Sequence, residues 1–285
     1  MNSKKVVTTH FKQYACILLG ALYFVLPRVN AQPTIPQSKP SMTPASPVLP
    51  PTATSDPLAI QALHKVIEAS GGMKVWRDIH SAKIRLAITP MGAAQAHEFL
   101  MLDDWSSDST RYRRGAIGMT KAPKDHNGQT TFIASSGEQQ RAVPEYDQAR
   151  VLAGSLPAAA AEIILRKPSY IAVQASGAKC TSDNLCIDIY RQAAPKLPFV
   201  REEEWIISQS SGLPTVIDLL LPNLSGGRPV VEEFQFDQMF SQNGLQIPSR
   251  IIMRHPSGAT HVRTVVSFQP NVEFDKAAFD KELSQ

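Results

Sequence analysis

Apolar residues recur at two different spacings along the chain, and the change between them marks out the expected elements. Across Leu58–Ile67 they recur every three or four residues, as on one face of a helix. Asp56-Pro57 before them is a typical helix start, because the acid can cap the helix and proline is tolerated at its first position. A glycine pair and a short second helical turn follow, and the spacing then changes to alternation over Ile84–Ile88, which predicts a strand.

Alternating residues bounded by turn signals continue over most of the remaining chain and predict about ten strands. The further expected strands are His97–Asp103, Arg111–Met119, Thr130–Ala134, Gln139–Val143, Tyr170–Ala175, Cys186–Gln192, Glu203–Ser208, Thr215–Leu221, Val230–Gln235, Pro248–Met253 and Thr260–Phe268. The stretches between them are short turns, apart from a helical segment over Asp147–Lys167 that is interrupted at Leu156-Pro157. No crossover helix is available for parallel pairing, so we expect antiparallel strands.

The run Ala158–Leu165 is apolar nearly all round, which predicts a helix buried on more than one side. Phe274 and Phe279 are spaced to dock a short C-terminal helix. The predicted fold class is therefore α+β, with a large curved antiparallel sheet, an incomplete β-barrel, closed by helices on its concave face.

The N-terminal residues 1–31 have the three parts of a cleavable secretory signal. A basic start precedes the apolar run Ala15–Leu26, which is too short to span a bilayer, and Val29-Asn30-Ala31 places the expected cleavage after Ala31. Residues 32–57 are rich in proline and poor in charge, which predicts a disordered spacer. Residues 58–285 are expected to form a single domain, and the mature protein to be a periplasmic or secreted monomer with no transmembrane span.

The charge balance argues against a nucleic-acid partner. The signal segment holds four of the 29 basic residues and no acid, which leaves 25 basic and 25 acidic residues in the mature chain. The net positive charge of the whole sequence therefore belongs to the targeting segment, and a neutral mature protein lacks the electrostatic footprint of nucleic-acid binding.

Candidate catalytic groups are few, so we expect no enzyme, no cofactor and no metal site. The histidines have no metal-ligand spacing, and no nucleophile elbow or phosphate-binding loop occurs. Glu202-Glu203-Glu204 could supply a general acid, but three adjacent carboxylates at a strand edge are expected to form a solvated face. His64 and His261 are expected to lie at the surface. A hydrolase would require carboxylates and a histidine to converge in a pocket, for example Glu98 or Asp104 with His126.

Arg111-Tyr112-Arg113-Arg114 is the sharpest basic cluster. On a strand, Arg111 and Arg113 share one face. They are candidates for contacting an anion or a lipid headgroup at the rim of a cavity; the alternative is an exposed strand with paired charges.

Cys180 and Cys186 remain after removal of the signal and could form a metal half-site, a redox pair or a disulfide. Two thiolates without a nearby histidine or second cysteine pair lack half of the ligands of a zinc site, and the spacing is not that of a redox motif. Both residues are expected in an oxidising compartment, and the residues between them are turn formers. We therefore expect a Cys180–Cys186 disulfide across a hairpin tip, stabilising by roughly 2–3 kcal/mol.

Several stretches, in this order, resemble secreted relatives of the periplasmic lipoprotein-localisation carrier, the LolA-like superfamily. The helix, glycine pair and first strand over Ala62–Ile84 are similar to the opening of those proteins. Trp205–Asp218 resembles their strand, Gly-Leu-Pro turn and next strand; Asn243–Ile251 resembles a hairpin; and Phe268–Phe279 resembles the terminal strand and helix. The proline-rich extension, the cysteine pair and the greater length differ from the plain carrier.

The resemblance implies an apolar cavity between sheet and helices, which in the carrier shields acyl chains of lipoproteins, whereas related proteins sense envelope stress. The expected function is thus a non-catalytic carrier or sensor that binds a lipid, an acyl chain or a lipoprotein. The alternative is an envelope interaction module with a filled core and a protein partner. Ten apolar residues are expected to line the cavity, namely Ile84, Leu86, Phe99, Met101, Ile164, Leu165, Trp205, Ile207, Ile217 and Leu219.

Overall fold

The computed structural model describes residues 48–105, 110–116, 139–143, 148–177, 179–221 and 229–273, with backbone alone for 110–116 and 139–143. All of these residues belong to one compact unit, Thr43–Gln285. The expected strand at Thr130–Ala134, the end of the strand expected to reach Met119, and the C-terminal helix lie outside the described residues.

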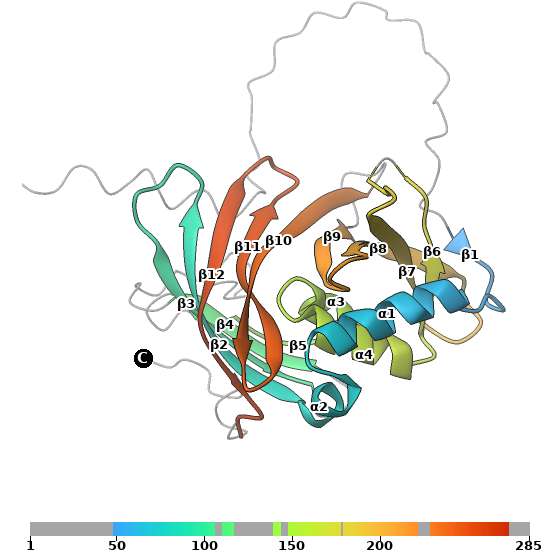
Figure 1. Cartoon of the computed structure of the whole chain (residues 1–285), viewed down its shortest axis with the longest axis horizontal. Coiled ribbons are helices and arrows are strands. Elements are labelled where there is room, and N and C mark those ends of the chain that lie inside the picture. Colours follow the sequence, from blue (N-terminus) through green and yellow to red (C-terminus); the bar gives the residue numbers. More distant parts are fainter. Residues whose placement is uncertain are drawn as a thin grey trace, which may run out of the picture. The chain divides into compact units, whose positions relative to one another are not determined.

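A twelve-stranded antiparallel sheet forms most of the described chain (Figure 1). Its order is β5-β4-β3-β2-β12-β11-β10-β9-β8-β7-β6, and β1 pairs separately with β8. The strands are β1 (Val48–Leu49), β2 (Ser81–Pro90), β3 (His97–Asp104), β4 (Thr110–Ala116), β5 (Gln139–Val143), β6 (Tyr170–Gln174), β7 (Asn184–Arg191), β8 (Phe199–Ser208), β9 (Pro214–Leu221), β10 (Val230–Gln242), β11 (Leu245–Arg254) and β12 (Thr260–Pro270).

The sheet is curved and open, which confirms the predicted fold class. Its path begins at β5 and ends at β6, so these two strands are edges and the sheet does not close into a barrel. Register shifts interrupt the pairing of β12 with β2, β7 with β8, β8 with β9, and β10 with β11. Such irregularities bend a strand and increase its local twist, which allows the sheet to wrap around the helices.

Two helices come from the first part of the chain, α1 (Pro57–Ala69) and α2 (Met73–Asp78). Asp56 caps α1, because its side chain accepts a hydrogen bond of 2.8 Å from the Leu58 amide. The C-terminal end of α1 lies against the β10–β11 turn, where the Gln246 amide donates to the Ser70 carbonyl. Gly71 has φ of 123°, and a Cβ there would lie 3.0 Å from the Gly244 carbonyl oxygen, so this close approach requires glycine.

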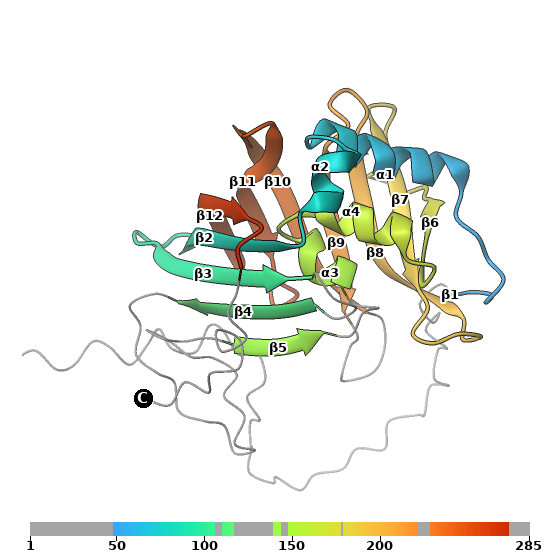
Figure 2. The same ribbon diagram turned by 90° about the horizontal axis from the view of Figure 1, so that it is seen from below.

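The mid-chain helical segment is divided into α3 (Gln148–Ala153) and α4 (Pro157–Arg166), as the proline at its centre predicts. Both helices lie with α1 and α2 against one face of the sheet (Figure 2). Every residue of α4 from Pro157 to Ile164 is buried, because the helix contacts α1, α2 and α3 as well as β6. This confirms the expectation of burial on more than one side.

The N-terminal residues 48–56 are tied to the sheet. Leu49 pairs with Phe199 of β8 and, together with Ala53, packs on a small apolar cluster beside the main core. The Ser55 hydroxyl and the Asp56 amide form hydrogen bonds with the backbone of Ala172 in the edge strand β6. The expectation that the spacer reaches residue 57 is therefore wrong from Val48 onward, because local apolar contacts and hydrogen bonds offset the cost of ordering this segment.

Candidate functional site

The ten residues expected to line a cavity are brought together by the fold, on strands β2, β3, β8 and β9 and helix α4. Eight of them are buried members of one hydrophobic cluster, and Phe99 and Leu165 are partly buried against it. Trp205 and Ile217 are fully inaccessible to solvent. In this structure these side chains pack against one another as a core, and none of them lines either of the two hollows described next.

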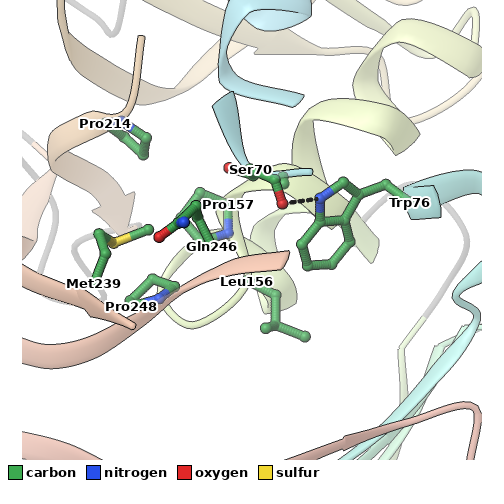
Figure 3. Close-up of a pocket in the computed structure, with 9 residues that line it drawn as sticks. Ser70, Trp76, Leu156, Pro157, Pro214, Met239, Gln246 and Pro248 are labelled. Carbon is green, nitrogen blue, oxygen red and sulfur yellow. Dashed lines mark hydrogen bonds between the residues drawn. The ribbon is translucent and has the colours of Figure 1, made fainter. Parts of the chain in front are cut away.

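The first hollow lies between the helices and the β10–β11 hairpin and is very small (Figure 3). It has a volume of about 10 Å³, which is close to the minimum for a single water molecule. Trp76 lies on one side of it and donates a 3.0 Å hydrogen bond to the Ser70 carbonyl (Figure 3). This part of the sheet–helix interface is therefore filled by side chains. The nine lining residues are Ser70, Trp76, Leu156, Pro157, Ala158, Pro214, Met239, Gln246 and Pro248.

The second hollow is an open cleft of about 460 Å³. Its lining residues come from α2, the α2–β2 connection, the residue after β3 and the C-terminal half of α4. They are Arg77, Ile79, His80, Trp105, Glu162 and Arg166. The volume is within the range of small-molecule sites in proteins, roughly 300–1,000 Å³.

The apolar floor of the cleft is fixed by two hydrogen bonds from Trp105 to backbone carbonyls. The Trp105 indole nitrogen donates to the Ile79 carbonyl at 3.1 Å, and the Trp105 amide donates to the His80 carbonyl at 2.8 Å. Ile79 and Trp105 are both nearly inaccessible to solvent and belong to the same hydrophobic cluster as the predicted cavity residues. The cleft is therefore continuous with the apolar layer between sheet and helices.

The rim of the cleft carries more positive than negative charge. Arg77 and Arg166 are exposed, whereas Glu162 is buried. The Arg166 Nε atom lies 3.3 Å from a carboxylate oxygen of Glu162, one helical turn earlier in α4. This pairing neutralises one arginine and leaves Arg77 as the excess cation among the lining residues. A site with an apolar floor and a cationic rim is suited to an amphipathic anion.

Sequence reasoning missed this cleft, because its residues are far apart along the chain. Arg77 and Arg166 each lie in the last turn of a helix, where a basic residue is also favoured by the helix dipole. Trp105 directly follows β3, whose last four residues are all buried. The sequence signal for this cleft was a tryptophan at the end of a predicted strand. That signal does not show which residues from other segments surround the tryptophan.

The carboxylates Glu202 and Glu203 are buried, so the expectation of a solvated Glu202–Glu204 face is wrong for these two residues. Glu202 accepts two hydrogen bonds from the Arg191 guanidinium, of 2.7 and 2.5 Å. Glu203 accepts a 2.6 Å hydrogen bond from the Trp205 indole. Burial is possible because β8 is an interior strand and both carboxylates have donors, which reduces the cost of removing them from water.

Four acidic residues on adjacent strands lie directly opposite one another across β7, β8, β9 and β10. They are Asp188, Glu204, Asp218 and Glu233. We call these four residues the acidic row. It lies on the face away from the core, because neighbouring Ile187, Trp205 and Ile217 point into the core.

Basic residues lie between the members of the acidic row. The Lys179 ammonium is 2.7 Å from Asp218 and 3.0 Å from Glu233, and Arg201 contacts both Asp188 and Glu204. Burial raises the pKa of Asp218, and the pairing with Lys179 only partly opposes this effect. Burial also raises the pKa of Asp188 despite the nearby Arg201. The row is thus a structural ion network with cations already in place.

Cys180 and Cys186 form a disulfide, as the sequence predicts. The bond links the β6–β7 connection to β7, and the Ala175 amide next to it donates to the Cys186 carbonyl. Glu204 of β8 also lies here, with a ligand oxygen and both sulfur atoms all within 4.8 Å of one another. Among the described residues this is the group of cysteine, histidine and carboxylate side chains that is close enough to hold a metal ion.

His261 is buried in the sheet, so the expectation of a surface position is wrong, whereas His64 is exposed as expected. His261 lies on β12 opposite Met253, and its ring is 4.9 Å from that of His255 in an edge-to-face arrangement. Burial lowers the pKa of His261, and the nearby His255 and Arg263 lower it further. The sequence pattern predicted that His261 lies in a strand, but it did not indicate that the His261 side chain is buried.

The remaining candidates lie apart from the cleft or outside the described side chains. Arg111 pairs with Asp104 and Arg113 with Leu102 along β4 and β3, and the side chains of β4 are not among the described atoms. Glu98 is exposed and forms a 2.8 Å salt bridge with Arg85. His126, the histidine of the hydrolase hypothesis, lies outside the described residues. Among the helices of the described part, none is long and apolar enough to cross a membrane.

No protein-family model matches the sequence, and no curated protein matches it. Solved structures do match. A LolA superfamily protein from Nitrosomonas europaea has 14% sequence identity and a TM-score of 0.45, with 78% of this chain and 97% of that chain covered. A DUF1329 family protein from Desulfovibrio piger has 10% identity and a TM-score of 0.45, with 79% and 98% covered.

A third match is a domain of a proposed outer membrane lipoprotein-sorting protein from Vibrio parahaemolyticus. It has 9% identity and a TM-score of 0.43, with 78% of this chain and 96% of that chain covered. One of these three structures bears the name of the superfamily that the sequence motifs resemble, and its sequence identity to this chain is 14%.

Proposed function

We propose that this protein is a non-catalytic periplasmic or secreted carrier or sensor that binds an amphipathic anion, such as a fatty acid or the acyl chains of a lipid or lipoprotein. The observation that carries the proposal is the 460 Å³ cleft with an apolar floor of Ile79 and Trp105 and a cationic rim. Such a site excludes water from an apolar chain while an arginine guanidinium pairs with the headgroup.

Because the cleft floor is continuous with the hydrophobic core, a longer acyl chain could extend from the cleft into the apolar layer. Ile79 and Trp105 belong to the same hydrophobic cluster as Ile84 and Met101 of the sheet and Ile164 of α4. An acyl chain that enters past Trp105 would meet apolar side chains along its whole length. Because that layer is filled in this structure, deeper insertion requires the helices to move relative to the sheet, as packed helices do in shear motions.

The expected secretory signal and the Cys180–Cys186 disulfide support a periplasmic or secreted location. A carrier or sensor in that compartment would meet lipids and lipoproteins directly. The absence of a catalytic motif in the sequence is the reason for proposing binding without chemistry.

Titration of the delipidated protein with a fluorescent fatty acid tests this function. We expect saturable binding of one probe per chain. The double substitution Arg77→Gln and Arg166→Gln should weaken binding at least tenfold, since a hydrogen bond to a charged group contributes about 1.5–3 kcal/mol. Arg85→Gln is the matched control, because Arg85 is an exposed arginine paired with Glu98 away from the cleft.

A probe in which an alcohol replaces the carboxylate should bind equally to the parent protein and to the double variant. Absence of saturable binding would refute the proposal, and so would equal binding of the carboxylate probe to the parent and the double variant. The first outcome would favour the second candidate function, an envelope interaction module without a ligand. That candidate is supported by the packing of the ten predicted cavity residues into a filled core.

A further inference from the structure

The disulfide loop brings three potential metal ligands together on the face of the sheet away from the helices. Cys180 lies in the β6–β7 connection, Cys186 in β7 and Glu204 in β8. Cys186 is opposite Ile206, two residues from Glu204 on the same side of the strand, and so Glu204 is its diagonal neighbour. The two sulfur atoms and a Glu204 oxygen all lie within 4.8 Å of one another.

We propose that reduction of the Cys180–Cys186 bond converts this loop into a binding site for one zinc ion, with the two thiolates and the Glu204 carboxylate as ligands. Thiolates are the form of cysteine that binds metals, and a disulfide provides none. Zinc is held by cysteine sulfur at about 2.3 Å and by carboxylate oxygen at about 2.0–2.2 Å, usually with four ligands. Three ligands from the protein leave the fourth position to water.

The chemistry of the conversion requires an external reductant. A phosphine, for example, takes up the oxygen of one water molecule to become a phosphine oxide, and the two hydrogens of that water end on the two sulfur atoms. Zinc binding then forms two zinc–sulfur bonds and releases the two thiol protons to solvent. A dithiol donor would reduce the bond by exchange and become a disulfide itself.

Contacts other than the disulfide hold the loop in place, so reduction should leave the ligands close together. The Cys180 amide donates to the Gly177 carbonyl at 3.0 Å, and the Asn184 amide donates to the Thr181 carbonyl at 3.1 Å. The Gln209 amide donates to the Asp183 carbonyl at 2.9 Å, which ties the loop to the turn after β8. Lys179 anchors the other side through its 2.7 Å contact with Asp218.

The two oxygen atoms of the Glu204 carboxylate have different neighbours. Its Oε2 atom accepts a 3.0 Å hydrogen bond from Arg201, which fixes the side chain. A Cβ placed on Gly177 would lie 3.8 Å from both the Oε1 atom and the Cys180 sulfur. The Oε1 atom is therefore turned toward the cysteine pair, and the missing side chain at Gly177 leaves room beside both ligand atoms.

Zinc titration of the purified protein, in competition with a chromophoric chelator, tests the site. We expect one zinc ion per reduced chain, with two protons released, and at least tenfold weaker binding by the oxidised chain. Glu204→Gln should weaken binding by the reduced chain at least tenfold. Asp183→Asn, a carboxylate removed from the same loop but outside the three-ligand cluster, should leave the affinity unchanged.

Several results would overturn the proposal. The proposal would be wrong if the reduced chain bound no zinc. It would also be wrong if the reduced and oxidised chains bound zinc with equal affinity. Equal affinity of Glu204→Gln and the parent would show that Glu204 is not a ligand. Loss of the folded far-ultraviolet circular dichroism spectrum on reduction would show that the loop is not held without the disulfide, which contradicts the geometry argued above.

Discussion

At the scale of single residues, the positions that differ from expectation are polar side chains that the fold buries. Glu203 and His261 occur in segments that were correctly predicted as strands, and Glu202 directly precedes one of these predicted strands. Alternation identifies two faces of a strand, but a carboxylate or an imidazole on the inner face is recognised only when its partner is known. The partner Arg191 lies on a neighbouring strand, Trp205 further along the same strand and His255 in the β11–β12 connection, so the contacts exist only after folding.

The buried histidine makes the stability of the protein dependent on pH. The folded-state pKa of His261 is below the ordinary value of 6.5, because of burial and then the neighbouring His255 and Arg263. The unfolded chain therefore binds the proton more tightly, and the contribution of His261 to stability is complete above pH 6.5 and is lost as the pH falls below it. Glu232 is the acid that pairs with the neighbouring His255, at 3.0 Å.

We expect His261→Phe to reduce the loss of unfolding free energy between neutral and mildly acidic pH. Denaturant unfolding of the parent and the variant above and below pH 6.5 measures this difference. His64→Phe is the control, because His64 is exposed on α1 and its removal should leave the pH dependence as in the parent. An unchanged pH dependence in His261→Phe would contradict the assignment.

At the scale of elements, helices and strands were predicted well wherever the pattern was local. The break between α3 and α4 follows from Leu156-Pro157. The bounds of β5 in the structure are those predicted from the sequence. Strand ends were less certain. β10 continues to Gln242 and β8 begins at Phe199, because pairing with neighbouring strands extends them beyond the alternating residues. The short strand β1 was missed, since its two residues form a strand only by pairing with β8.

The turn between α3 and α4 is fitted closely to the sheet. A Cβ at Gly154 would lie 2.6–2.9 Å from three ring atoms of Phe234, which is buried on β10. Gly154→Ala should therefore lower the unfolding free energy by about 1–3 kcal/mol, as overpacking of a core commonly does. Combining it with Phe234→Leu should cost less than the sum of the two single changes, since the smaller side chain makes room for the added methyl group.

Denaturant unfolding of the parent, both single variants and the double variant measures this coupling. If Gly154→Ala had the same unfolding free energy as the parent, the turn between α3 and α4 would not be packed against β10. Strictly additive effects would show that Phe234 is not the neighbour that matters.

At the scale of the whole molecule, the fold class was predictable because strand pattern, turn residues and helix positions all indicate one curved antiparallel sheet with helices on one face. The candidate site was not. The predicted cavity residues do converge, but they pack as a core, and the cleft beside them is lined by residues from three separate segments of the chain. Only the three-dimensional arrangement places Arg77 and Arg166 around the same apolar floor.

The proposed function places an acyl chain against Trp105 in the cleft, where a brominated fatty acid would quench the fluorescence of this tryptophan. The protein has three tryptophans, of which Trp105 alone lines this cleft. We expect saturable quenching in the parent and in Trp76→Phe, and loss of the saturable component in Trp105→Phe. Saturable quenching that persists undiminished in Trp105→Phe, or no saturable quenching in the parent, would contradict the proposed position of the acyl chain.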